Sequence, residues 1–165
     1  MIDALLVSHL QHDPAIASLV SYQSEDETLF RISVGDVPAD DEGSPIVATY
    51  IWLSLFQEEP ILDLDGKSGL SRFNFDVECC STDPNEAKRL GRLVHKRLQG
   101  FQGYFQVDGI QSPTRDEREF IQGVFVEGKD DEYEKQNTFG EADITIVALE
   151  VQCVANDEIE DLETA

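Results

Sequence analysis

The chain has few basic residues for its size. Only 12 of its 165 residues are Lys or Arg, whereas 34 are Asp or Glu, so the formal net charge is −22 at pH 7. A surface of this sign repels the phosphates of nucleic acids and of anionic membranes. This charge argues against nucleic-acid or membrane binding as the main function, although such a protein can still surround DNA without holding it.

Cysteine is also scarce, because the chain has only Cys79, Cys80 and Cys153. Three cysteines, two of them adjacent, form neither a disulfide framework nor a zinc-binding spacing. Neighbouring side chains of a regular strand point to opposite faces, so a bond between Cys79 and Cys80 is not expected. We expect free thiols in a reducing compartment.

Long hydrophobic runs are missing. No stretch approaches 18 apolar residues, and the first residues lack the basic start and apolar run of a signal peptide. We therefore expect a soluble protein that is made and used without export and has no membrane partner. The 41% of apolar residues and the length predict one domain that buries on the order of 70% of its unfolded surface.

The sequence patterns of common active sites are absent too. The chain has no Gly-rich phosphate loop, no Gly-x-Ser-x-Gly and no Cys-x-x-Cys. Its acids concentrate in polar segments, where a solvated carboxylate keeps an ordinary pKa and does no general-acid work at neutral pH. The sequence predicts no catalytic residues, no cofactor and no enzyme.

Two segments resemble fragments of metal sites. His9 and His12 beside Asp13 could offer two imidazoles and a carboxylate, but no third strong ligand is identifiable. The segment 63–66 (Asp-Leu-Asp-Gly) resembles part of a calcium loop, yet Asn74 stands where the bidentate Glu would fall. A β-turn accounts better for the second segment, and we predict no metal site.

Residues 72–80 have the alternation of a half-buried strand. Because successive strand side chains point to opposite faces, one face is wet and the other is apolar. The wet face carries Arg72, Asn74, Asp76 and Glu78, and the apolar face carries Phe73, Phe75, Val77 and Cys79. This pattern is typical of an antiparallel strand with one face on a core.

An amphipathic helix is predicted to follow this strand. Asp83 is suited to the N-cap, Pro84 to the first helical position and Glu86 to the first turn, so the helix should begin at Pro84. Gly100 is suited to its end. The apolar stripe that should pack on the strand consists of Ala87, Leu90, Gly91, Val94, Leu98 and Phe101.

The other side of this helix holds five of the 12 basic residues: Lys88, Arg89, Arg92, Lys96 and Arg97. With the single acid Glu86, residues 84–98 carry +4, which leaves −26 for the rest of the chain. One interpretation is a solvated face whose cations offset an acidic protein. The other is a cationic subunit or partner interface that meets an acidic surface of a neighbouring copy or another protein.

The remaining elements are predicted from local patterns. Two short helices, or one kinked at Pro14, should form the start of the chain, and polar segments should form loops at 37–44, 58–70, 112–119 and 127–137. Further strands are expected at 29–34, 45–56, 103–110, 120–126 and 144–154. The apolar run 45–56 suggests burial on both faces.

Together these elements predict an α+β fold: an antiparallel sheet of about five strands, with the N-terminal helix and the amphipathic helix on one face. We expect a single domain over residues 1–154, which includes an extended charged loop or hairpin region at 112–142. Residues 155–165 are expected to form an acidic, disordered tail.

Several ordered segments resemble the tail-completion or tail-terminator proteins of long-tailed bacteriophages. The resemblance covers roughly residues 1–154, and each motif is weak when taken alone. The segments are the N-terminal helix followed by Asp13-Pro14-Ala15-Ile16, Ser44-Pro45-Ile46-Val47 opening a strand, Leu64-Asp65-Gly66-Lys67-Ser68-Gly69-Leu70, Phe73-Asn74-Phe75-Asp76-Val77-Glu78, Asn85-Glu86-Ala87-Lys88-Arg89-Leu90, Val107-Asp108-Gly109-Ile110 and Ala142-Asp143-Ile144-Thr145-Ile146. The stronger acidity, the charged segment 112–137 and the acidic tail depart from the family.

This resemblance implies a ring, usually of six copies, at the head-proximal end of a tail tube. Such a ring ends tube polymerisation, contacts the tail tube protein and the head-completion or neck protein, and encircles DNA without sequence-specific binding. The expected location is the head–tail junction of the virion, reached from the host cytoplasm during assembly. The alternatives are another neck or baseplate component, an acidic protein-interaction module, or an inhibitor that mimics DNA.

Overall fold

The computed structural model describes residues 2–36, 48–63, 66–104, 120–136 and 143–156. Its helices are α1 (Ile2–Gln11), α2 (Pro14–Val20) and α3 (Pro84–Leu98). Its strands are β1 (Ser21–Ser24), β2 (Glu27–Phe30), β3 (Ile32–Val34), β4 (Tyr50–Asp63), β5 (Gly66–Ser81), β6 (Gly103–Tyr104), β7 (Phe120–Gln136) and β8 (Asp143–Asn156).

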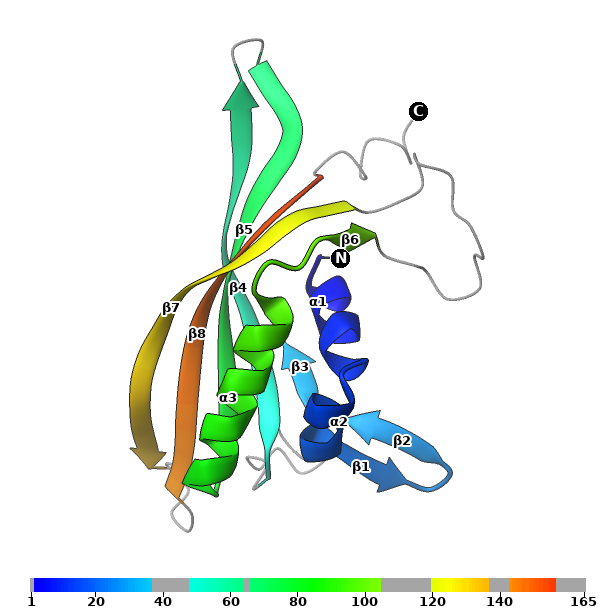
Figure 1. The fold of residues 1–165 in the computed structure, drawn as a ribbon, viewed down its shortest axis with the longest axis vertical. Helices are drawn as coiled ribbons and strands as arrows, with labels where there is room; N and C mark the ends of the chain where they lie inside the picture. Colours follow the sequence, from blue (N-terminus) through cyan, green and yellow to red (C-terminus); the bar gives the residue numbers. More distant parts are fainter. Residues whose placement is uncertain (1, 37–47, 64–65, 105–119, 137–142, 157–165) are drawn as a thin grey trace.

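The predicted α+β class is confirmed. Six strands form one sheet in the order β3-β4-β5-β8-β7-β6, and β1 pairs with β2 in a separate two-stranded sheet. Figure 1 shows the helices gathered on one side of the larger sheet. The expectation of an antiparallel sheet was wrong at one place, because β3 runs parallel to β4. The short strands β3 and β6 bring the number of strands to six.

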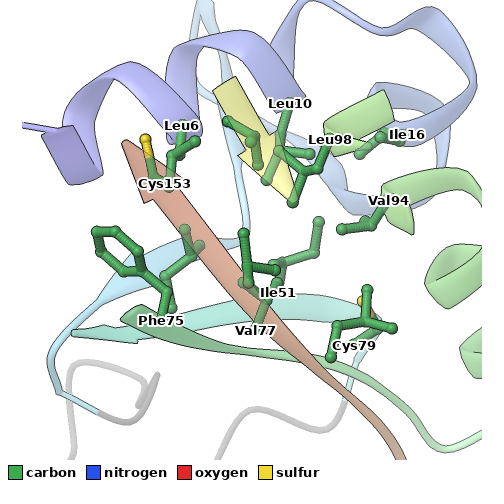
Figure 2. Packing of buried hydrophobic residues seen from close by; sticks show 14 of the residues in the cluster. Leu6, Leu10, Ile16, Ile51, Phe75, Val77, Cys79, Val94, Leu98 and Cys153 are labelled. Atoms are coloured by element: carbon green, nitrogen blue, oxygen red, sulfur yellow. The ribbon is translucent and has the colours of Figure 1, made fainter. Parts of the chain in front are cut away.

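The core lies between the helices and the face of β5 that the alternation predicted to be apolar. Phe75, Val77 and Cys79 are fully buried there, and Figure 2 shows them below side chains of the helices. The predicted stripe of α3 from Ala87 to Leu98 is buried against the same face. Residues of α1 and α2 belong to the same hydrophobic cluster. The packing of the N-terminal and amphipathic helices on this face is therefore confirmed.

The predicted starts of α2 and α3 are confirmed, but Glu86 has a different role from the one expected. Asp83 is the N-cap of α3, and its carboxylate accepts a hydrogen bond from the Asn85 amide at 2.8 Å. Glu86 instead accepts from Thr49 Oγ1 at 2.7 Å and from Ser81 Oγ at 3.3 Å. It therefore ties the start of the helix to β5 and to the residue before β4. Asp13 likewise caps α2, so the N-terminal segment forms two helices.

Gly91 lets α3 approach β8 closely. A Cβ atom at this position would lie 2.6 Å from Cγ1 of Val147 and 3.2 Å from its Cβ. Valine is stiff at χ1, so it cannot easily turn aside. The absence of a side chain at position 91 therefore sets the distance between helix and sheet.

Gly91→Ala is expected to destabilise the protein despite the higher helix propensity of Ala. Propensity favours Ala by about 1 kcal/mol, whereas overpacking a tight core costs roughly 1–3 kcal/mol. Chemical denaturation of the variant should show a lower free energy of unfolding. Adding Val147→Ala should make Gly91→Ala less harmful than it is alone, and strict additivity of the two changes would contradict a steric clash.

Two predicted loops are strand in the structure. The segment 58–70 was expected to be a loop, but β4 and β5 continue their pairing as far as Asp63 and Gly66. The segment 127–137 was also expected to be a loop, but β7 pairs with β8 as far as Gln136. In both cases a long partner strand supplies hydrogen bonds that local propensity does not count. Pro60 is tolerated because β3 pairs with β4 only through Leu53, so Pro60 lies at a sheet edge.

The predicted strand 29–34 is divided. Arg31 separates β2 from β3, and its amide donates to the carbonyl of Val20 at 2.8 Å. The strand β1 was missed because its sequence, Ser-Tyr-Gln-Ser, has no alternation. In the described part of the run 45–56, Tyr50 and Ile51 are buried on opposite faces of the sheet, but Leu55 and Phe56 are 45% and 56% exposed. Burial on both faces therefore holds only for part of this run.

Some expectations lie outside the described residues. These are the loop 37–44, the greater part of the strand 103–110, the charged turn 112–119 and residues 157–165 of the expected tail. The expectation that this tail begins at residue 155 was wrong, because β8 continues to Asn156 in its pairing with β5, and Ala155 is buried.

Candidate functional site

The basic residues of α3 do not all share one environment. Arg89, Arg92 and Lys96 are exposed, whereas Lys88 and Arg97 are partly buried. The three exposed cations are separated by three and four residues, so they lie on adjacent turns of one helix face. We call Arg89, Arg92 and Lys96 the cationic ridge.

The cationic ridge has no acidic partner within the described part of the chain. None of its three side chains lies within 4 Å of a described carboxylate, and the ion pair between Arg72 and Glu59, at 3.9 Å, lies elsewhere. Like charges on adjacent helical turns destabilise a helix by a few tenths of a kcal/mol. The helix dipole favours Lys96 in the last turn, but it does not account for Arg89 or Arg92. The ridge is therefore available for a partner.

Arg97 has a structural contact instead. Its Nε donates to the carbonyl oxygen of His9 at 3.1 Å, and Nε2 of His9 lies 3.0 Å from the Arg97 carbonyl oxygen. The His9 ring also stacks on Phe101, with 3.6 Å between ring centroids. These contacts fasten the end of α1 to the end of α3. Of the five predicted interface residues, Arg97 thus serves at least partly to hold the helices together.

The histidines do not converge on a metal site. His9 faces Arg97, and Nδ1 of His12 lies 2.6 Å from the carbonyl oxygen of Ser8 in its own helix. Within the described ranges, no three His, Cys, Asp or Glu side chains are grouped so that they could hold a metal ion.

The burial of His9 between α1 and α3 makes stability depend on pH. Burial lowers the pKa of His9 below its usual 6.5; the hydrogen bond to the Arg97 carbonyl and the charge of Asp13 oppose this shift, and the charges of Arg97 and His12 add to it. As the pH falls below 6.5, His9 is protonated in the unfolded chain but stays neutral in the folded protein. The free energy of unfolding therefore falls with pH until the pKa of His9 in the folded protein is reached.

His9→Gln is the matched variant, because Gln can donate a hydrogen bond but does not titrate. The Tm advantage of the natural protein over this variant should shrink as the pH falls from 7.5 to 5.5. Thermal melts at both values measure it. An advantage that grows on acidification would contradict the direction of the shift.

Exposed carboxylates lie on the face of the sheet opposite the helices, which we call the acidic face of the sheet. Asp76 of β5 is directly paired with Glu150 of β8, and both side chains are exposed. Like charges directly opposite each other on neighbouring strands are destabilising. The sequence identified Asp76 and Glu78 as residues of the wet face, but only the strand pairing shows that Glu150 joins them.

The side chain of Asn74 belongs to a row of hydrogen-bonded amide side chains. It donates to Gln57 and accepts from Gln152, each at 3.3 Å, across three neighbouring strands. Its position in the middle of β5 excludes the role of a calcium-loop ligand. Residues 64–65, which include Asp65, lie outside the described residues.

The three cysteines are buried, and none of them forms a disulfide bond. Cys79 faces the main core and Cys80 faces a smaller cluster on the other side of the sheet, as the alternation predicted. Burial raises the pKa of Cys79 well above its usual value and that of Cys153 to about 12. These thiols therefore lack the thiolate that nucleophilic chemistry requires.

No described helix is both long enough and apolar enough to span a lipid bilayer. When the chain is compared with known proteins, no family model matches it, and no curated protein is similar enough to count as a match. The two surfaces that stand out in the described residues are the cationic ridge on α3 and the acidic face of the sheet.

Proposed function

We propose that the chain is a structural protein that forms a ring, six copies in the family it resembles, at the head-proximal end of a phage-like tail tube. The ring stops tube polymerisation and joins the tail to the head or neck. Its partners are further copies of itself, the tail tube protein and the head-completion protein. In this proposal the chain has no catalytic role and needs no cofactor.

The cationic ridge is the observation that supports this proposal best. Three exposed cations share one helix face and have no described acidic partner, although acids outnumber bases by 34 to 12. A closed ring needs a heterologous interface, in which one patch meets a different patch of the next copy. A cationic patch on an otherwise acidic chain attracts an acidic patch of the neighbouring copy, whereas the acidic surfaces of two copies repel each other.

The acidic face of the sheet fits the wall of a DNA channel. Exposed carboxylates such as Asp76 and Glu150 repel phosphates, so DNA can pass without adhering. The same face favours a second candidate function, which is mimicry of DNA towards a basic DNA-binding enzyme. Displacement of labelled DNA from such an enzyme by the purified chain would support the second function, and displacement is not expected for a tail ring.

The oligomeric state of the purified chain tests the ring directly. Sedimentation velocity at low and moderate ionic strength should show a closed oligomer, and electron microscopy of the same sample should show rings with a central channel. Salt should weaken the oligomer because exposed charges are screened within about 8–10 Å at physiological ionic strength. A monomer under all these conditions would contradict the proposal.

A further inference from the structure

The hairpin formed by β1 and β2 extends from the body of the protein. We call residues 21–30 the arm. Its strands pair only with each other among the described strands, and no residue of either strand is buried. Figure 1 shows the arm beyond α2, away from the larger sheet. A two-stranded hairpin is at best marginally stable without further packing, so the arm presents an unpartnered sheet face.

The arm carries groups that bind cations. Glu25, Asp26 and Glu27 are exposed at its tip. Tyr22 and Leu29 face each other across the two strands, and they are 39% and 37% exposed. Carboxylates and aromatic rings are the two groups to which guanidinium binds best. Within the chain, the guanidinium of Arg31 already lies over the ring of Tyr22, 4.9 Å from the ring centroid.

The arm and the cationic ridge complement each other in charge, but they cannot meet within one molecule as it is folded. Figure 1 shows the arm and α3 on different sides of α2, and the tip of the arm points away from α3. The ridge offers two guanidinium groups and one ammonium group, and the tip offers three carboxylates. A contact between these surfaces therefore requires a second copy of the chain.

We infer that the arm of one copy docks on the cationic ridge of the next copy and that this contact closes the ring. The inference rests on the proposed ring and names the acidic surface that meets α3. Arm and ridge are different patches, so the contact is heterologous and repeats from copy to copy. It covers Tyr22 and Leu29, which are 39% and 37% exposed in the single chain. It also gives the ridge an acidic partner, which the described residues of its own chain do not provide.

A charge exchange tests this contact. The arm variant is Glu25→Lys with Glu27→Lys, the ridge variant is Arg92→Glu with Lys96→Glu, and a third protein combines all four changes. Sedimentation velocity over a range of concentrations should show assembly weakened at least about 100-fold in the ridge variant and at least about tenfold in the arm variant. It should be largely restored in the combined protein, which has the natural net charge and the two signs exchanged.

Thermal melts of each variant are the control for correct folding. A further variant, Glu25→Gly, removes a tip carboxylate without disturbing the backbone. Glu25 has a left-handed backbone with φ of 52°, which glycine adopts without strain. Glu25→Gly should therefore melt no lower than the natural protein and still assemble more weakly, because one tip carboxylate is gone.

The outcomes separate the arm contact from the ring itself. If the natural chain forms rings and the arm variant assembles equally well, or if the combined protein is no better than the single variants, the arm contact is rejected and the ring stands. If the natural chain stays monomeric at every concentration, both are rejected.

Discussion

Reversing Arg92 and Lys96 to Glu is expected to weaken assembly by at least about 100-fold in the dissociation constant, which corresponds to about 2.8 kcal/mol. The change removes two attractions and places two repulsions against an acidic surface. Close charge pairs at protein interfaces have measured couplings of roughly 1.5–7 kcal/mol. The fold should persist because both side chains are exposed and make no described ion pair.

The matched control keeps the charges and exchanges the side chains. Arg92→Lys with Lys96→Arg should assemble nearly as the natural chain does, with a modest loss if Arg92 binds a carboxylate in a bidentate manner. Analytical ultracentrifugation measures association, and thermal melting of each protein confirms folding. Unchanged assembly and particle infectivity in the double Glu variant would refute the role of the ridge.

Phe75→Ala is expected to be the most damaging single substitution for stability. Phe75 is fully buried in the middle of the core between sheet and helices. Removing a buried Phe side chain costs roughly 3–5 kcal/mol. For a domain of this size the loss should lower the Tm by on the order of 10 °C.

Leu55→Ala provides the matched control. Leu55 is the direct cross-strand partner of Phe75 and lies on the same face of the sheet, but it is 45% exposed. Its truncation should therefore cost much less than that of Phe75. Differential scanning calorimetry of both variants measures the difference, and equal losses would show that position 75 is not in the centre of the core.

The part of the fold that the sequence predicted well is the part where local signals and packing agree. The alternation from Phe73 to Cys79 and the stripe on α3 have clear periods, and the Asp-Pro pairs at 13–14 and 83–84 mark where helices begin. Their burial and boundaries were accordingly confirmed. The long hairpins were missed because Glu, Asp and Pro disfavour strands locally, whereas pairing with a long neighbouring strand supplies hydrogen bonds that local propensity does not count.

The candidate site was predictable only in part. The five cations are evident from the sequence, but the division into an exposed ridge and the structural Arg97 depends on its contact with His9, 88 residues away. The pairing of Asp76 with Glu150 depends on the order of the strands. Of the arm, the sequence predicted only residues 29–30, as the start of the expected strand 29–34. The strand β1 was missed because Tyr22 is its only apolar residue.

Immunogold electron microscopy tests the central claim most directly. An antibody to this protein would be applied to particles purified from cells that carry the genome encoding it, under conditions that expose the neck. We predict gold label concentrated where head meets tail. Particles that remain unlabelled, with the antigen found only in the host cytosol, would contradict the account.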